Sequence, residues 1–339
     1  MRTLYIHVGL PKTGSSSIQR FLVDNRAALL AAGLGLGPFM TMASGKSLPL
    51  RQAIAGRGLP QVMAELAASP GQNLVVSDEH LSSILVDEAE ATAVRDAALP
   101  HFRPVVVVFL RRQDYWHESL YTQNVKTTYA GTMQAYTESV LADYAADFDF
   151  DGCIARLERL FGAENLRVLL FRDDGPNDAV ADFLAALDLD LDLDLGRARV
   201  AGRQNASPHR RKVLFLSQVP KPDPEIQDLS WFMTTVVEKT GAIADDGVRF
   251  LLAPRDRHRL VALHADGNRA LLARYGLDDG GHFASPPDPD ADWSPPRPIT
   301  FRERHAVLAE ALGTSVRLKG PRFAARITRK VASLYLRMP

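Results

Sequence analysis

A glycine-rich turn near the N-terminus contains residue types that bind phosphate. Residues 7–22 read HVGLPKTGSSSIQRFL. Gly9, four intervening residues, Gly14 and two serines match the frame of the phosphate-binding loop G-x-x-x-x-G-K-[ST]. Lys12 lies before the second glycine, however, and Ser15 stands where that motif has its lysine. The turn therefore predicts an anion site whose cation lies within the loop.

The turn lies between a predicted strand and a predicted helix, as a phosphate site requires. The apolar run Thr3–Val8 precedes it, and a helical pattern follows it. Backbone N–H groups of residues 13–16 would converge on an anion at the helix N-terminus, helped by the helix dipole. The hydroxyls of Ser15, Ser16 and Ser17 add donors, although a hydroxyl run of this kind also caps helices.

The place of Lys12 bears on which phosphate compound would bind. In nucleoside-triphosphate enzymes the lysine after the second glycine reaches the β- and γ-phosphates, and the next hydroxyl binds Mg²⁺. Lys12 instead lies inside the turn, beside whatever leaves from a bound terminal phosphate. A lysine in that place can neutralise charge on a bridging oxygen without a metal ion.

Arg111 and Ser119 follow another apolar run, Pro104–Leu110. If that run is a parallel strand, Arg111 lies at its carboxyl end, where open α/β sheets bind ligands. Ser119 comes eight residues later, on a predicted helix. A forked guanidinium suits phosphate, and a serine hydroxyl can support it. The alternative is a structural ion pair of Arg111, for example with Asp114.

A carboxylate and an imidazole follow the apolar run Asn73–Ser77. Glu79 and His80 would lie at the carboxyl edge of the same sheet, where either could take a proton from a nucleophilic hydroxyl. The structural alternative has Ser77 or Asp78 capping a helix, with Glu79 and His80 in its solvated first turn. A third interpretation is the aspartate strand that helps to hold Mg²⁺ in P-loop NTPases, although Ser77 interrupts its apolar run.

Four short apolar runs alternate with helical patterns. Their β-branched content and near-continuous hydrophobicity predict parallel strands that are covered on both faces. The alternation predicts an open, mostly parallel α/β sheet flanked by helices, and the C-terminal part reads mainly helical. The predicted strands are Thr3–Val8, Asn73–Ser77, Pro104–Leu110 and Leu166–Phe171.

Composition changes near residue 285 and suggests three parts. Residues 1–284 would form the main domain, and the Pro/Asp-rich stretch 285–300 an exposed linker. Residues 301–339 contain nine Lys and Arg against two Glu and would form a basic amphipathic helical tail. Such a tail fits a solvated helix that docks on the body, or a helix that lies on an anionic membrane.

The overall composition narrows the partners and the compartment. The formal net charge of the 339 residues is zero, which gives no reason to expect a nucleic-acid partner. Cys153 is the single cysteine, so neither an intrachain disulfide nor a Cys-based metal cluster is expected. The N-terminus does not read as a signal peptide, and no apolar run reaches a membrane span of about 18–20 residues. We therefore expect a cytoplasmic protein, with peripheral contact at the inner membrane face if the tail binds lipid.

Three segments, in this order, resemble the sulfotransferase family that uses 3′-phosphoadenosine 5′-phosphosulfate, and its bacterial members most. They are PKTGSSS (Pro11–Ser17), SDEHLSS after the second predicted strand, and LRRQDYWHES (Leu110–Ser119). The resemblance is clearest over residues 1 to about 190, and it implies a P-loop NTPase-like three-layer fold with a central, mostly parallel sheet flanked by helices. The chain departs from the family pattern in two places. Ser15-Ser16 stand where TT or ST is usual, and a second basic residue often found within the Arg/Ser segment is replaced near His117.

The resemblance implies a role for each candidate residue. Glu79 would be the catalytic base, with His80 adjacent as the alternative. Arg111 and Ser119 would hold the 3′-phosphate of the donor. The 5′-phosphosulfate would be held by Lys12, Thr13, Gly14, Ser15 and Ser16, with Ser17 as a further cofactor-binding hydroxyl.

The reaction implied is an in-line, metal-free transfer of a sulfonate group to a hydroxyl or amine, which leaves 3′,5′-adenosine bisphosphate. The acceptor would be a carbohydrate, a glycolipid or a small molecule. A P-loop small-molecule kinase or other NTPase is the alternative. A third possibility is a non-enzymatic scaffold that keeps the fold.

Overall fold

The computed structural model describes most of the chain, and its contacts divide into two units. The first unit comprises Met1–Gln113, Ala145–Asn205 and Val261–Pro286, and the second comprises the rest. The basic tail expected at 301–339 is described only over residues 301–314, which are helical; its proposed apolar face lies outside the described residues. The division into a domain at 1–284, a linker and a tail stays a prediction. The described residues are 1–38, 40, 56, 58–143, 145–173, 178–189, 208–219, 221 and 227–314.

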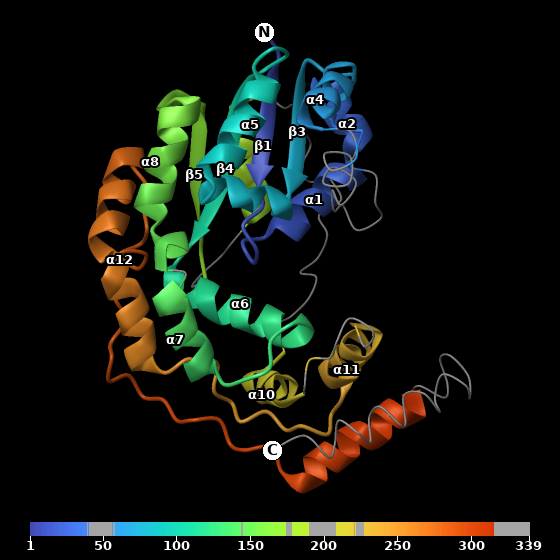
Figure 1. Cartoon of the computed structure of the whole chain (residues 1–339), viewed down its shortest axis with the longest axis vertical. Coiled ribbons are helices and arrows are strands. Elements are labelled where there is room, and N and C mark those ends of the chain that lie inside the picture. Colours follow the sequence, from blue (N-terminus) through green and yellow to red (C-terminus); the bar gives the residue numbers. More distant parts are fainter. Residues whose placement is uncertain are drawn as a thin grey trace. The chain divides into compact units, whose positions relative to one another are not determined.

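The first unit is built on a five-stranded sheet in the order β2-β3-β1-β4-β5 (Figure 1). Every neighbouring pair is parallel, so the mostly parallel sheet predicted from the sequence is confirmed. The three-residue strand β2, which reads LGL, was not predicted because it is too short to show a strand pattern. The strands are β1 (Thr3–Val8), β2 (Leu34–Leu36), β3 (Asn73–Asp78), β4 (Arg103–Arg111) and β5 (Leu166–Phe171).

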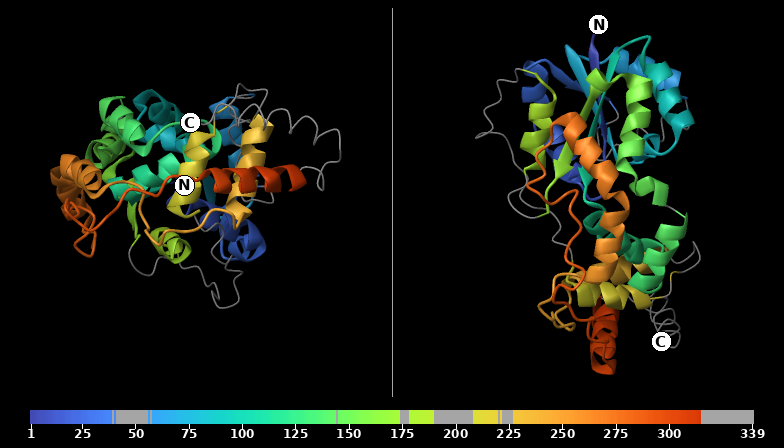
Figure 2. Two further views of the ribbon diagram at one scale, coloured as in Figure 1. Left: turned by 90° about the horizontal axis from the view of Figure 1, so that it is seen from below. Right: turned by 90° about the vertical axis from the view of Figure 1, so that its left-hand side faces the viewer.

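Helices cover both faces of this sheet, as the right-hand view of Figure 2 shows. One face carries α1, α2 and α9, whose apolar side chains share one buried cluster with the sheet. α5 and α8 pack on β4 from the other face, and α4 packs on α5. The layers are thus helix, sheet and helix, as the sequence predicted. The helical elements are α1 (Ser15–Asp24), α2 (Arg26–Ala31), α4 (Leu59–Ala67), η1 (Glu79–Leu85), α5 (Glu88–Ala98), η2 (Ala145–Phe148), α8 (Phe150–Phe161), η3 (Ala163–Asn165) and α9 (Ala179–Ala186).

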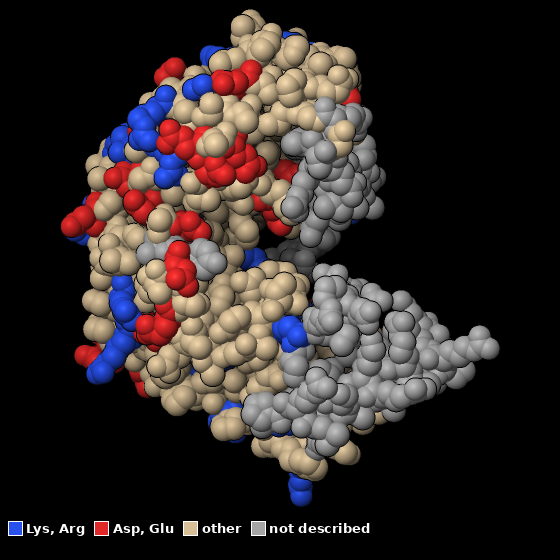
Figure 3. Space-filling view, viewed as in Figure 1, with Lys and Arg blue, Asp and Glu red and all other residues tan. Residues whose placement is uncertain are grey.

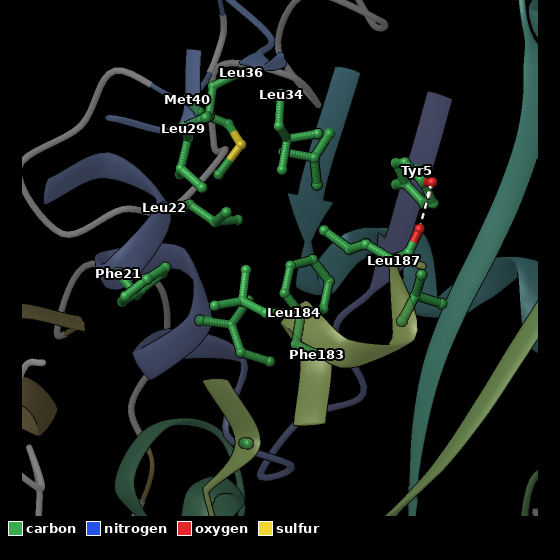
Figure 4. Packing of buried hydrophobic residues seen from close by; sticks show 14 of the residues in the cluster. Tyr5, Phe21, Leu22, Leu29, Leu34, Leu36, Met40, Phe183, Leu184 and Leu187 are labelled. Carbon is green, nitrogen blue, oxygen red and sulfur yellow. Dashed lines mark hydrogen bonds between the residues drawn. The ribbon is translucent and has the colours of Figure 1, made fainter. Parts of the chain in front are cut away.

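The core on the α1 face is formed by residues far apart in the sequence (Figure 4). Phe21 and Leu22 of α1 are buried together with Phe183 of α9 against the sheet. Tyr5 of β1 also belongs to the core, and its hydroxyl donates to the carbonyl of Leu187 at 2.6 Å. This packing fixes the start of α1, and with it the turn that joins β1 to α1.

The carboxyl edge of the sheet is where the connections change sides. Val8 of β1 lies opposite Asp78 of β3 and Val108 of β4, and β4 continues to Arg111. The chain leaves β1 toward α1 on one face, and leaves β3 toward α5 on the other. Open α/β sheets bind ligands at such a switch point.

The edge of the first unit formed by α8 and α12 (Pro254–Tyr275) carries charges of both signs (Figure 3). Arg274 on α12 pairs with Asp151 at 2.7 Å and with Glu158 at 3.0 Å, both on α8. Ion pairs at a partly exposed edge each contribute little to the free energy of unfolding, and they are typical of a solvated surface.

The second unit is helical over most of its described length. Residues 287–300 of the Pro/Asp-rich stretch lie in this unit and have neither helix nor strand, and two buried arginines hold their backbone. Arg210 donates to the carbonyl of Ser294 at 2.7 Å, and Arg211 donates to that of Pro298 at 3.1 Å. The helices are α6 (Gln113–Thr127, whose first residue belongs to the first unit), α7 (Met133–Asp143), α10 (Arg210–Gln218), α11 (Gln227–Lys239), the first residues of α12, and residues 301–314.

The apolar runs of the sequence are too short to predict a membrane span. Among the helices that the structure describes, none is both long and apolar enough to cross a bilayer.

Candidate anion-binding and catalytic site

The turn between β1 and α1 closes around the carbonyl oxygen of Leu10. The hydroxyl of Thr13 donates to this oxygen at 2.7 Å, and that of Ser15 at 3.3 Å. The turn is tied to β3 as well, because the N–H of Gly9 donates to the carbonyl of Asp78 at 3.3 Å. Thr13 and Ser15 are 0% and 2% exposed, so their side chains form the inner wall of the turn.

The four candidate hydroxyls therefore differ in what they can do. A hydroxyl has one O–H donor, and those of Thr13 and Ser15 already use theirs on Leu10. Ser16 is exposed and Ser17 is half-buried in the first turn of α1. In this arrangement Ser16 and Ser17 are the hydroxyls that can donate to a bound anion.

Two residues of the turn have left-handed backbone conformations. Lys12 has φ 71° and Gly14 has φ 85°. Glycine is required at position 14 for a second reason, because a Cβ there would lie 2.8 Å from the Cβ of Ala179 and 3.3 Å from the ring of Phe171. As the N-cap of α1, Gly14 offers no side-chain acceptor to the orphan N–H groups of the first turn. Those N–H groups, at the positive end of the helix dipole, favour an anion.

Glu79 lies directly beside this turn. A Cβ placed on Gly9 would lie 3.0 Å from the hydroxyl of Ser15 and 3.4 Å from the Cα of Glu79. The end of β1, the start of α1 and the start of η1 therefore meet at Gly9. This close approach brings the backbone of the predicted base next to the predicted anion-binding turn.

The backbone geometry distinguishes Glu79 from His80. Asp78 is the N-cap of η1, and its carboxylate accepts from the N–H of His80 at 2.8 Å. The capping alternative from the sequence is thus present, and His80 lies exposed in the first turn. Glu79 is half-buried and is the residue whose Cα borders the turn. The assignment of either as base stays a prediction, and the geometry favours Glu79.

Arg111 is joined to the turn, and it also forms an ion pair. Its Nη1 donates to the carbonyl of Lys12 at 3.0 Å, and its Nε donates to Asp173 at 2.8 Å. Its Nη2 donates to the other carboxylate oxygen of Asp173, and its guanidinium lies 5.3 Å from the ring centroid of Phe171. A structural ion pair was one of the two interpretations from the sequence, but with Asp114. Asp114 instead pairs with Arg257 at 2.8 Å in the second unit.

Ser119, the second predicted contact of the 3′-phosphate, lies on α6 in the second unit, so the structure does not join it to this cluster. His117, on the same helix, is fully buried. Its Nε2 lies 2.9 Å from the hydroxyl of Thr137, and its ring stacks on Tyr136. Burial lowers the pKa of His117 to about 4, so at neutral pH it brings no positive charge to a phosphate.

His7 and Ser77 form a buried polar pair that sequence reasoning did not identify. They are register partners on β1 and β3, and His7 Nδ1 lies 2.6 Å from the Ser77 hydroxyl. The His7 ring packs between Phe109 and Phe183, and burial lowers its pKa to about 3. The available signal was one polar residue inside each of two apolar runs. This pair also explains why Ser77 interrupts the second run.

Over the part of the chain that the structure describes, no three His, Cys, Asp or Glu side chains gather closely enough to hold a metal ion.

The fold is a P-loop NTPase-like, three-layer α/β arrangement, and the turn between β1 and α1 is a candidate anion-binding site at the switch point of its sheet. No protein-family model matches the chain, and no curated protein sequence matches it. Among solved structures it is similar to the crystal structure of a sulfotransferase from Alicyclobacillus acidocaldarius. The two share 15% sequence identity over 83% of this chain and 98% of that chain, with a TM-score of 0.45. A likeness at this level does not establish a shared family, so a functional assignment depends on the residues of this chain.

Proposed function

We propose that this protein is a sulfotransferase that moves a sulfonate group from 3′-phosphoadenosine 5′-phosphosulfate to a hydroxyl or amine of an acceptor. One observation carries the proposal. The glycine turn holds its lysine inside the loop, its Gly9 borders the Cα of Glu79, and Arg111 binds the backbone of that same lysine. The residues that carry a cation and a carboxylate, Lys12 and Glu79, therefore adjoin an uncapped helix N-terminus at one edge of the sheet.

Each group has a part in the proposed transfer. The backbone N–H groups of the turn and the hydroxyls of Ser16 and Ser17 would hold the 5′-phosphosulfate. Lys12 would neutralise the charge that develops on the bridging oxygen as the S–O bond to the donor breaks. Glu79 would take the proton of the acceptor hydroxyl as its oxygen attacks sulfur in line. Thr13 and Ser15 would shape the turn through Leu10, a structural part.

Arg111 can serve the 3′-phosphate without giving up its present contacts. A guanidinium has five N–H donors, of which Asp173 takes two and the Lys12 carbonyl takes one. Within the described residues nothing accepts from the other two, which belong to Nη1 and Nη2. We propose that these two donate to the 3′-phosphate, with Ser119 as the supporting hydroxyl implied by the family resemblance.

The acceptor that we propose is a carbohydrate or glycolipid, with a small molecule as the other class. The protein would then act in the cytoplasm, and residues 301–339 would bring it to the inner membrane face. Incubation with ³⁵S-labelled donor and fractionated cell glycans and lipids tests this directly. Label should enter one fraction with the wild-type protein and not with Glu79→Gln. Anionic vesicles should bind the full chain better than a chain that ends at Pro298, and equal binding would refute the membrane contact.

A thermal-shift experiment separates this function from that of a P-loop kinase. 3′,5′-Adenosine bisphosphate should raise the melting temperature in EDTA, because the proposed site needs no divalent ion. Stabilisation by ATP with Mg²⁺ alone would instead support the kinase. Lys12→Ala should weaken the stabilisation by the bisphosphate. Arg20→Gln is the control that removes a nearby positive charge, since Arg20 lies on α1 outside the turn and pairs with Asp24 at 2.6 Å.

A further inference from the structure

Asp173 lies two residues beyond β5 and binds the arginine that holds the turn. Both of its carboxylate oxygens accept from Arg111, one from Nε at 2.8 Å and the other from Nη2. The Arg111 and Asp173 side chains are 14% and 8% exposed, so the pair is largely withdrawn from water. Neither the motif nor the proposed reaction gives Asp173 a part.

The two-point contact fixes which way Arg111 faces. A carboxylate that binds the Nε and Nη2 edge of a guanidinium sets the plane of the fork. In that plane Nη1 points at the Lys12 carbonyl, 3.0 Å away. The ring of Phe171 supports the same guanidinium from β5 and also lies against Gly14 of the turn. Asp173 therefore sets the orientation of Arg111, and through it the hydrogen bond to the backbone carbonyl of Lys12 in the turn.

The residue held in this way needs to be held. Lys12 has φ 71°, a conformation that a residue with a Cβ adopts only when its surroundings impose it. The charged hydrogen bond from Arg111 is an interaction that imposes it. If Arg111 turned away, the Lys12 backbone could relax to the ordinary right-handed or extended region, and the direction of its side chain would change with it.

We propose that Asp173 is a positioning residue for Lys12: its ion pair orients Arg111, which fixes the backbone of the turn and so the lysine cation. Asp173 touches neither donor nor acceptor in this proposal. The structural part stands on the geometry alone, whereas its effect on sulfonate transfer rests on the proposed function.

Hydrogen–deuterium exchange of the ligand-free protein tests the structural part. The turn is protected through the N–H groups of Gly9, Leu10, Ser17 and Ile18, each of which is hydrogen-bonded. In Asp173→Asn, exchange of peptides covering residues 7–22 should quicken by about fivefold or more, while peptides of the sheet core stay at the wild-type rate. Wild-type exchange of residues 7–22 in a folded Asp173→Asn protein would overturn the proposal.

Two further variants keep this test decisive. Asp173→Glu keeps the negative charge and should therefore retain part of the protection that Asp173→Asn loses. If Asp173 acted only through packing, the charge of the replacement would not matter. Asp24→Asn removes a surface ion pair with Arg20 on α1 and should leave the exchange of residues 7–22 unchanged. If Asp173→Asn fails to fold, the pair Arg111→Gln with Asp173→Asn removes both charges and should show the same loss of protection. Full protection in this pair would also refute the proposal.

A kinetic cycle tests the catalytic consequence. Asp173→Asn should lower kcat by about tenfold with less change in the donor KM, since a misplaced cation mainly loses contact with the transition state. In the Lys12→Ala background the same substitution should change kcat by no more than about twofold, because the cation it positions is gone. If Asp173→Asn lowered kcat by the same factor in the Lys12→Ala background as in the wild type, the two residues would act independently and the proposal would be contradicted. Faster exchange in Asp173→Asn, with no transferase activity in the wild-type protein, would support this inference and reject the proposed function. Transferase activity in the wild type, with unchanged exchange in Asp173→Asn, would support the proposed function and reject this inference.

Discussion

Gly14→Ala is the substitution whose cost the structure defines best. A Cβ at this position would lie 2.8 Å from the Cβ of Ala179 and 3.3 Å from the ring of Phe171, and the backbone has φ 85°. The left-handed conformation costs an alanine about 1–2 kcal/mol. Overpacking against α9 and β5 adds about 1–3 kcal/mol. We therefore expect the free energy of unfolding to fall by about 2–5 kcal/mol, as measured by urea denaturation.

Two other glycines separate these contributions. Gly247 has φ 74°, and no atom lies within 4 Å of the position that a Cβ would take, so Gly247→Ala should show the backbone cost alone. Gly241 has open space and no left-handed φ, so Gly241→Ala should change stability by less than about 0.5 kcal/mol. Gly14→Ala should also abolish protection of the turn and binding of 3′,5′-adenosine bisphosphate. If Gly14→Ala costs no more than Gly247→Ala, the close packing of the turn against β5 and α9 is refuted.

Two further predictions concern proton binding. Glu79→Gln should lower kcat by about 10²–10⁴-fold while it spares nucleotide binding, and His80→Gln should change kcat by less than about fivefold; steady-state kinetics that showed the reverse order would make His80 the base. Burial lowers the folded-state pKa of His7 to about 3, so the unfolded chain binds the extra proton between pH 6.5 and 3. The neutral form of His7 therefore supports the fold above pH 6.5, and this support is lost as the pH falls, by about 1.4 kcal/mol per unit below pH 6. Urea denaturation of His7→Gln should show a shallower acid dependence than the wild type, and parallel curves would contradict the assignment.

The sheet could be predicted from the sequence because its strands are buried on both faces. Continuous β-branched runs such as Pro104–Leu110 have few other stable arrangements, and the observed strand β4 extends the run by one residue at each end. β2 could not be predicted, because three residues with a central glycine show no period. The helical pattern that follows the turn forms two helices rather than one, since the chain breaks at Asn25 between α1 and α2.

The candidate site was predictable only in part. The turn and the approach of Glu79 follow from local motifs at the ends of parallel strands, which the register brings to one edge. The partner of Arg111 does not follow, because Asp173 is 62 residues away and its loop carries no motif. Which hydroxyls could donate to an anion is set by the folded geometry of the turn itself, since Thr13 and Ser15 donate to the carbonyl of Leu10. Motifs therefore predict where the candidate site lies, and the folded structure shows which partners its side chains take.

Calorimetric titration with 3′,5′-adenosine bisphosphate in EDTA tests the central claim most directly. The product of the proposed reaction should bind the wild-type protein with a dissociation constant in the micromolar range, and at least about tenfold more tightly than 5′-AMP, which lacks the 3′-phosphate. Lys12→Ala and Arg111→Gln should each weaken this binding, whereas the control Arg20→Gln should leave it unchanged. Equal affinities for the bisphosphate and 5′-AMP, or tight binding of ATP only when Mg²⁺ is present, would contradict a sulfotransferase site.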